Sequence, residues 1–253
     1  MPRARVVLVH GLRTSATMWR RQLAFLERHD VDAIAIDLPG HGTRLGEAFT
    51  LDAAMDAMDA ALPPRGAESA ATPTLLVGLS LGGYLAVEFA ARHPGHIDGL
   101  VAASCGTRPR GAGLAGYRRI AALIGRLPDR GRALNDAMVR LFLRAEAVDD
   151  VLAGGVALDV MAPALTAVGE LDPEAALARI DVPIWFVNGR FDHFRFEERR
   201  MLRAAPDGRL VVVPGATHLV SLVRPDDFAA VVLGAVAEVE RRTTRRARRV
   251  TRS

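Results

Sequence analysis

An apolar run that ends in a serine flanked by glycines constrains this chain more than any other feature. Residues 74–79 read Thr-Leu-Leu-Val-Gly-Leu, and Ser80, Leu81 and Gly82 follow them and open a helical pattern. A serine on so tight a turn from strand to helix needs glycine on both sides, because a Cβ at Gly78 or Gly82 would collide with neighbouring backbone. The pattern predicts that the Ser80 hydroxyl projects above the end of a buried strand, at a helix N-terminus that favours negative charge.

Further apolar runs with strand character alternate with helical patterns along the chain. We predict about six strands, over residues 6–9, 31–36, 74–79, 100–103, 183–187 and 210–213. Helical patterns lie between or after them, over residues 18–29, 51–62, 84–92 and 226–240. This alternation is typical of an α/β fold with a doubly wound, mostly parallel sheet, in which ligands bind at the carboxyl ends of the strands.

The alternation is interrupted between residues 107 and 179. This stretch contains helical patterns over 114–127 and 133–147 and no convincing strand, so we predict a helical lid inserted over the sheet. The α/β core is then expected to comprise residues 1–106 and 180–240.

The high isoelectric point, about 10.3, comes from one end of the chain. Residues 241–253 contain seven arginines and no acidic residue, while the remainder carries 26 basic and 29 acidic side chains. We predict that this tail is disordered, as a solvated and frayed extension of the last helix, rather than a phosphate- or membrane-binding arm. A nucleic-acid-binding protein is not expected. That alternative rests on the tail alone and predicts salt-dependent DNA binding that is lost when the tail is deleted.

The apolar runs and the cysteine content indicate where in the cell the protein is expected. No apolar run approaches the roughly 20 residues of a membrane span, and the N-terminal apolar run is too short for a signal peptide. The single cysteine, Cys105, allows no internal disulfide and is compatible with a reducing compartment. We therefore expect a cytoplasmic monomer or homodimer without a membrane span, with Cys105 as a small buried apolar residue rather than a second nucleophile.

Five short motifs follow predicted strands or turns, in a fixed order. They are His10-Gly11, Asp-x-Pro-Gly-x-Gly at 37–42, Gly-x-Ser-x-Gly at 78–82, Gly-x-x-Asp at 189–192 and Gly-x-x-His at 215–218. Together they resemble the α/β-hydrolase superfamily over nearly the whole chain. The core of that superfamily usually opens with two more strands than this chain offers, so we expect the N-terminal strands to be shortened or absent and the sheet to be essentially all-parallel.

The resemblance implies a catalytic triad of Ser80 as nucleophile, His218 as general base and acid, and Asp192 as the carboxylate that orients the imidazole. It also implies an oxyanion hole formed by the backbone N–H groups of Leu12 and Leu81. Supporting positions are expected next to these residues, at His10, Gly11, Gly78 and Gly82. For His10, and for the nearby His41, we favour structural hydrogen-bonding roles.

These roles predict a cofactor-independent serine hydrolase that cleaves a small-molecule carboxylic ester, thioester or lactone through an acyl-enzyme. A carbon–carbon bond hydrolase, a perhydrolase or an acyltransferase would use the same triad and remains open. A non-catalytic ligand-binding protein ranks lower because all three triad residues are present. The chain shows no His-Glu-x-x-His motif, paired cysteines or dinucleotide fingerprint, so neither a metal nor a cofactor is expected.

The first part of the predicted lid is rich in arginine. Between residues 107 and 132 a single acidic residue, Asp129, accompanies a set of arginines: Arg108, Arg110, Arg118, Arg119, Arg126, Arg130 and Arg132. A basic lid beside such a site would attract an anionic substrate, for example a coenzyme A thioester or an acyl carrier protein, with Arg118 and Arg119 as candidate contacts. A solvated face in an arginine-rich chain is the alternative.

Overall fold

A single parallel sheet forms the centre of the computed structural model, which describes residues 3–63 and 72–250. Its six strands lie in the order β2-β1-β3-β4-β5-β6, and all neighbouring pairs are parallel. The strands are β1 (Arg5–Val9), β2 (Asp32–Ile36), β3 (Thr74–Leu79), β4 (Gly99–Ala103), β5 (Ile184–Gly189) and β6 (Gly208–Val213). The predicted strand number and the all-parallel sheet are confirmed, and the predicted positions agree to within a few residues.

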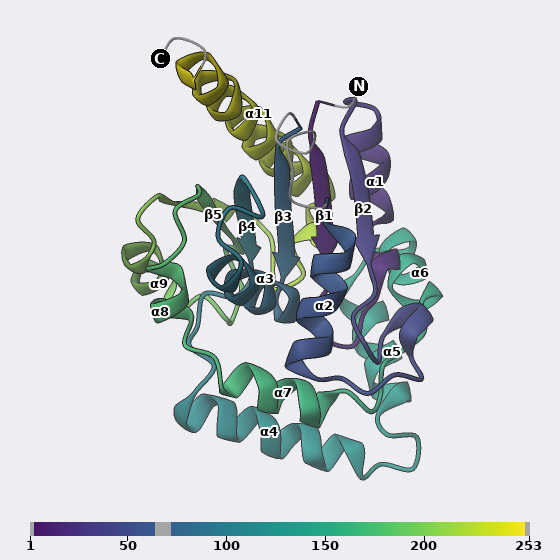
Figure 1. Ribbon diagram of the computed structural model, residues 1–253. Coiled ribbons are helices and arrows are strands. Elements are labelled where there is room, and N and C mark those ends of the chain that lie inside the picture. The colour runs from purple at the N-terminus through teal and green to yellow at the C-terminus, as the bar shows by residue number, and fades with distance from the viewer. Residues whose placement is uncertain (1–2, 64–71, 251–253) are drawn as a thin grey trace.

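Helices cover both faces of the sheet (Figure 1). Because side chains alternate along a strand, Val7 and Val9 face one apolar core while Val6 and Leu8 face the other. The first core lies under α2 (Leu51–Ala61), α3 (Leu81–Arg92), α8 (Pro173–Leu177) and α9 (Glu198–Ala204). The second lies under η1 (Ala16–Trp19), α1 (Arg20–Glu27), α10 (Val220–Val223) and α11 (Pro225–Val250). A short turn, η2 (Gly42–Arg44), follows β2.

The predicted helical insertion lies between β4 and β5. It consists of α4 (Gly111–Gly125), α5 (Arg132–Phe142), α6 (Ala145–Ala153) and α7 (Met161–Gly169), and in Figure 1 α4 and α7 lie beyond the arrowheads of the strands. The single helix predicted over 133–147 is two helices, because Leu143 has extended backbone (ψ 155°) and a buried side chain. The α8 helix lies within the predicted lid range but packs against α3 and α9 of the core.

The C-terminal tail differs from the prediction of a disordered segment. The α11 helix continues to Val250 and carries the chain away from the lid, while residues 251–253 lie outside the described part (Figure 1). Arginine is a good helix former, and Arg242 pairs with Glu238 one turn earlier (2.8 Å) and with Asp207 (2.6 Å). Among the described helices, α11 included, none has the combination of length and apolarity that crossing a bilayer demands.

Candidate active site

Ser80 stands on a sharp turn between β3 and α3. Its backbone has φ 55° and ψ −113°, a strained conformation for a residue with a Cβ, and its N–H donates to the Ala103 carbonyl at 2.8 Å. A Cβ at Gly78 would lie 2.2 Å from the carbonyl oxygen of Gly82, and one at Gly82 would lie 2.4 Å from that of Val9. Both flanking glycines are therefore required by close backbone contact, as the sequence predicts.

Three residues far apart in the sequence meet at the carboxyl ends of β3, β5 and β6. The Nε2 of His218 lies 2.9 Å from the Oγ of Ser80, and its Nδ1 lies 3.0 Å from the Oδ1 of Asp192. A carboxylate only accepts, so Nδ1–H donates to Asp192, and Nε2 is left to accept the Ser80 hydroxyl proton. The three residues predicted as a triad thus form one continuous hydrogen-bonded chain.

Asp192 is held as a carboxylate inside the protein, with 5% of its surface exposed. Burial works to raise the pKa of Asp192, but the hydrogen bond and charge of His218, together with the Phe194 N–H at 2.8 Å, hold that pKa below its usual value. The hydroxyl of Ser104 donates to the His218 carbonyl at 2.7 Å and fixes the loop that carries the imidazole. An ionised Asp192 stabilises the imidazolium that forms when His218 accepts a proton.

The candidate oxyanion donors are the N–H groups of Leu12 and Leu81. Leu81 is the first residue of α3, so its N–H has no acceptor within the helix. Leu12 follows β1, and both leucines line the same cavity as Ser80. Their participation in an oxyanion hole stays a prediction.

His10 and His41 hold the loops beside this site. The Nδ1–H of His10 donates to the Gly11 carbonyl (2.8 Å), and Nε2 accepts from the Leu38 N–H (3.0 Å). Complete burial, with the nearby His41, lowers the pKa of His10 to about 3, so the ring is neutral. The His41 ring packs 4.7 Å from that of His10, and its Nδ1–H donates to the Pro39 carbonyl (3.0 Å).

Above Ser80 lies a cavity of about 770 Å³ between the core and the lid. Its lid wall is mainly apolar, formed by Leu114, Tyr117, Ile120, Leu165 and Val168. Phe194 packs edge-on to Tyr117 at 6.0 Å between ring centres and completes the wall near His218. The cavity therefore offers a largely apolar chamber with the polar triad at its base.

Five of the seven lid arginines line one of two hollows. Arg108 and Arg110 line the cavity above Ser80, where Arg108 pairs with Glu197 (2.5 Å). Arg118 instead lines a second hollow of about 560 Å³ between α4 and α7, together with Arg13, Arg126 and Arg130. Arg119 is exposed on α4 and lines neither hollow. Neither of the two arginines predicted as substrate contacts therefore lines the cavity of the triad.

Cys105 is buried beside the nucleophile helix, where a Cβ on Gly83 would lie 2.8 Å from its sulfur. Burial raises the pKa of the thiol to about 12. The group therefore stays a protonated thiol at neutral pH, in keeping with a packing role.

The architecture agrees with comparisons to known proteins. A family model described as "Alpha/beta hydrolase family" matches residues 6–231. The chain belongs to the alpha/beta hydrolase family. Relatives of this α/β hydrolase include a pimeloyl-[acyl-carrier protein] methyl ester esterase of Neisseria meningitidis serogroup C, 29% identical over 78% of this chain and 79% of that protein. The esterase of the same name from Aromatoleum aromaticum is 26% identical over 92% and 98%.

Solved structures show the same fold. MenH from S. aureus superposes with a TM-score of 0.74 at 22% identity, covering 95% of this chain and 96% of that one. The enol-lactonase from Burkholderia xenovorans LB400 superposes with a TM-score of 0.72 at 23% identity, covering 92% and 91%. At this identity the likeness establishes the α/β-hydrolase fold of this chain.

Proposed function

We propose that this α/β hydrolase cleaves a carboxylic ester through an acyl-enzyme on Ser80, and that the acyl group reaches it on an acyl carrier protein. The observation that carries the first part is the hydrogen-bonded chain from Ser80 through His218 to Asp192. The second part is supported by the names of the relatives, which are esterases of an acyl-carrier-protein methyl ester, and by the basic lid.

The geometry supports a double-displacement reaction. The Ser80 oxygen attacks the ester carbonyl carbon while its proton passes to Nε2 of His218, and the tetrahedral oxyanion is held by the N–H groups of Leu12 and Leu81. The carbon–oxygen bond of the ester then breaks, and the alcohol leaves with the proton from His218. A water molecule attacks the acyl-enzyme in the same way, and the carboxylic acid leaves as Ser80 regains its proton.

The cavity supports an acyl substrate. Its volume, about 770 Å³, and its apolar lid wall suit a flexible carbon chain better than a highly polar group. Arg108 and Arg110 at the same cavity offer N–H donors for a polar end of the substrate, and their charges are balanced by Glu197 and Glu174.

The lid supports recruitment of an acidic carrier. Arg118, Arg126 and Arg130 line one hollow on and after α4, in which Arg130 pairs with Asp159. Residues 1–240 as a whole are mildly acidic. Acidic protein surfaces are steered to such a patch at long range, and their on-rate falls with ionic strength. A carrier-bound substrate also fits the cytoplasmic location predicted from the sequence.

The proposal is tested by labelling the purified protein with a fluorophosphonate and measuring intact mass. One adduct is expected on the wild type and none on Ser80→Ala. Hydrolysis of p-nitrophenyl esters of graded chain length then measures the acyl chamber. The methyl ester of a dicarboxylic acyl group, presented on a carrier protein and as the free pantetheine thioester, tests recruitment. An unlabelled, folded wild type would refute the acyl-enzyme, and equal kcat/KM on both methyl esters would refute the carrier.

A further inference from the structure

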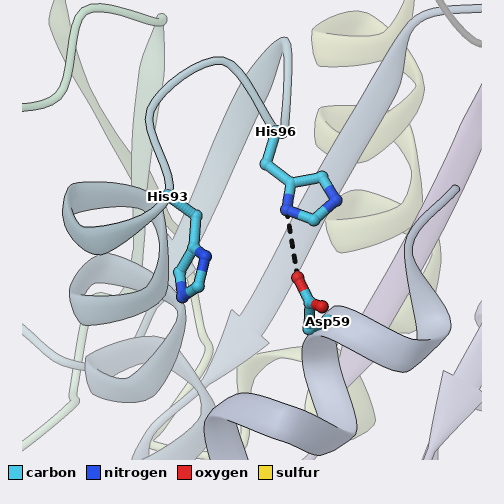
Figure 2. Close-up of side chains that lie close together, drawn as sticks. All are labelled: Asp59, His93 and His96. Carbon is cyan, nitrogen blue, oxygen red and sulfur yellow. Dashed lines mark ion pairs between the residues drawn. The ribbon is translucent and has the colours of Figure 1, made fainter. Parts of the chain in front are cut away.

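Two histidines and an aspartate gather at the end of α3 farthest from Ser80. Asp59 lies on α2, His93 follows the last residue of α3, and His96 comes three residues later (Figure 2). One ligand-type atom from each side chain lies within 4.8 Å of those of the other two. The twelve residues of α3 rise roughly 18 Å, so this cluster is separate from the triad.

The orientation of His96 leaves a lone pair facing a carboxylate. Its side chain is 8% exposed, and its Nε2 lies 3.4 Å from the Pro63 carbonyl oxygen. A carbonyl only accepts, so Nε2 carries the proton, and in the neutral ring Nδ1 is an acceptor. This Nδ1 is buried without a hydrogen-bond partner in the described structure and lies 3.2 Å from Oδ1 of Asp59, another acceptor. Two facing acceptors repel each other unless a proton or a metal ion lies between them.

The surroundings hold the other groups in place. The His93 ring stacks on Phe89, with 4.4 Å between ring centres and 15° between planes. Arg92 lines the same depression, about 540 Å³ in volume, but its guanidinium pairs with Glu88 at 2.7 Å. Within the described residues, the ion pairs of Asp59 include no arginine, only His96. The positive charge that this group of acceptors needs is therefore not supplied by the neighbouring arginine.

We propose that Asp59, His93 and His96 bind a divalent transition metal ion, with Zn²⁺ as the best match and solvent completing the coordination. Two imidazoles and one carboxylate are ligands that suit zinc, cobalt or nickel, whereas magnesium and calcium prefer oxygen ligands alone. The Nε2–H of His96 donates to the Pro63 carbonyl. A metal-binding histidine usually donates such a hydrogen bond from its other ring nitrogen, which fixes the orientation of the ring. The bound ion would tie the C-terminal end of α2 to the segment after α3 and stabilise the fold.

This site departs from the prediction that the chain binds no metal. The spacing His-x-x-His at 93–96 is visible in the sequence, but the third ligand, Asp59, lies on a different helix. Only the packing of α2 against α3 brings it to the histidines.

The test uses the full chain without a histidine tag, dialysed against a chelator and titrated with ZnCl₂ at pH 7.5 by calorimetry. We expect one equivalent bound at this site, a higher melting temperature with zinc, and visible absorption on Co²⁺ loading. Asp59→Asn and His93→Ala should each weaken zinc binding by about tenfold or more and remove the melting-temperature shift. His29→Ala, on the opposite face of the sheet, is the matched control and should keep both.

Zinc bound at His218 and His193, whose rings lie 5.1 Å apart, is distinguished by activity. One equivalent at the proposed site leaves ester hydrolysis unchanged, whereas an ion at the triad inhibits it. Zinc binding that survives in Asp59→Asn and His93→Ala, or that tracks inhibition, would overturn the proposal. An unchanged melting temperature of the wild type on addition of zinc would also overturn it, and would mean that a proton alone bridges His96 and Asp59.

Discussion

The carbonyl oxygen of Val9 lies where a side chain on Gly82 would begin, 2.4 Å from the position of its Cβ. The N-terminal turn of α3 therefore rests directly on the end of β1. Since Leu12 follows β1 and Leu81 opens α3, this contact sets the separation of the two candidate oxyanion donors. A residue without a side chain at position 82 is thus part of the geometry of the site.

Gly82→Ala should move these two segments apart. We expect a loss of about 1–3 kcal/mol in the free energy of unfolding, from overpacking against the backbone of β1. We also expect a loss of ester hydrolysis larger than the loss of folded protein explains. Gly234→Ala is the control, since Gly234 is exposed in α11 with nothing near its Cβ position, and alanine there should stabilise by up to about 1 kcal/mol. Urea unfolding and kcat/KM on a p-nitrophenyl ester measure both effects, and full activity in Gly82→Ala would contradict this account.

Asp192→Asn keeps the shape of the carboxylate and removes its charge. An amide can donate to Nδ1 of His218 and so favour the tautomer with its proton on Nε2, which cannot accept from Ser80. We expect kcat to fall by about 10³- to 10⁴-fold while the circular dichroism spectrum is retained. Asp181→Asn, at an exposed position before β5, should leave kcat unchanged. A decrease of less than tenfold in Asp192→Asn would argue against an orienting role for this carboxylate.

The triad geometry was accessible from the sequence because each member follows a strand. In a parallel sheet the strand ends share one edge, so the motifs around Ser80, Asp192 and His218 have to converge there. Gly78 and Gly82 were equally predictable, because a strand-to-helix turn of this kind leaves no room for side chains.

Features that depend on packing between elements were not predictable in this way. The break between α5 and α6 at Leu143 follows from burial of one side chain, which helical periodicity does not reveal. The helix that continues past residue 240 gains from the pairing of Arg242 with Asp207, a residue of another segment. That Arg118 lines the second hollow and not the cavity of the triad depends on how α4 packs against α7.

The double variant Arg118→Glu with Arg126→Glu tests recruitment of an acidic carrier. If the lid attracts the carrier, kcat/KM on a carrier-bound methyl ester should fall by about tenfold or more at low salt, and its salt dependence should flatten. Hydrolysis of a small neutral ester should be unaffected. Arg21→Glu, an exposed change on α1, is the control of equal sign and should leave both reactions as they are. An equal loss on the small ester would point to damage to the lid instead.

Burial of His10 makes stability dependent on pH in a defined direction. Its pKa, about 3 in the folded protein, is far below the value near 6.5 of an exposed histidine, and burial lowers the pKa of His41 as well. Below about pH 6.5 these two imidazoles are protonated in the unfolded chain but stay neutral in the folded protein. The free energy of unfolding should therefore fall as pH drops from about 6.5 towards 3, by up to about 1.4 kcal/mol per pH unit for each proton.

The variant His10→Gln separates the contribution of His10 from other pH effects. Its side-chain oxygen can accept from the Leu38 N–H in place of Nε2, so the chain should fold with lower stability at neutral pH. The loss of stability between pH 6.5 and 4.5 should be smaller than in the wild type by one proton's contribution. Leu26→Ala, a buried change in α1, should lower stability while keeping the wild-type slope. Urea titrations across this range measure how the free energy of unfolding changes with pH. The same pH dependence in His10→Gln and in the wild type would mean that a neutral, buried His10 is not the cause of the effect.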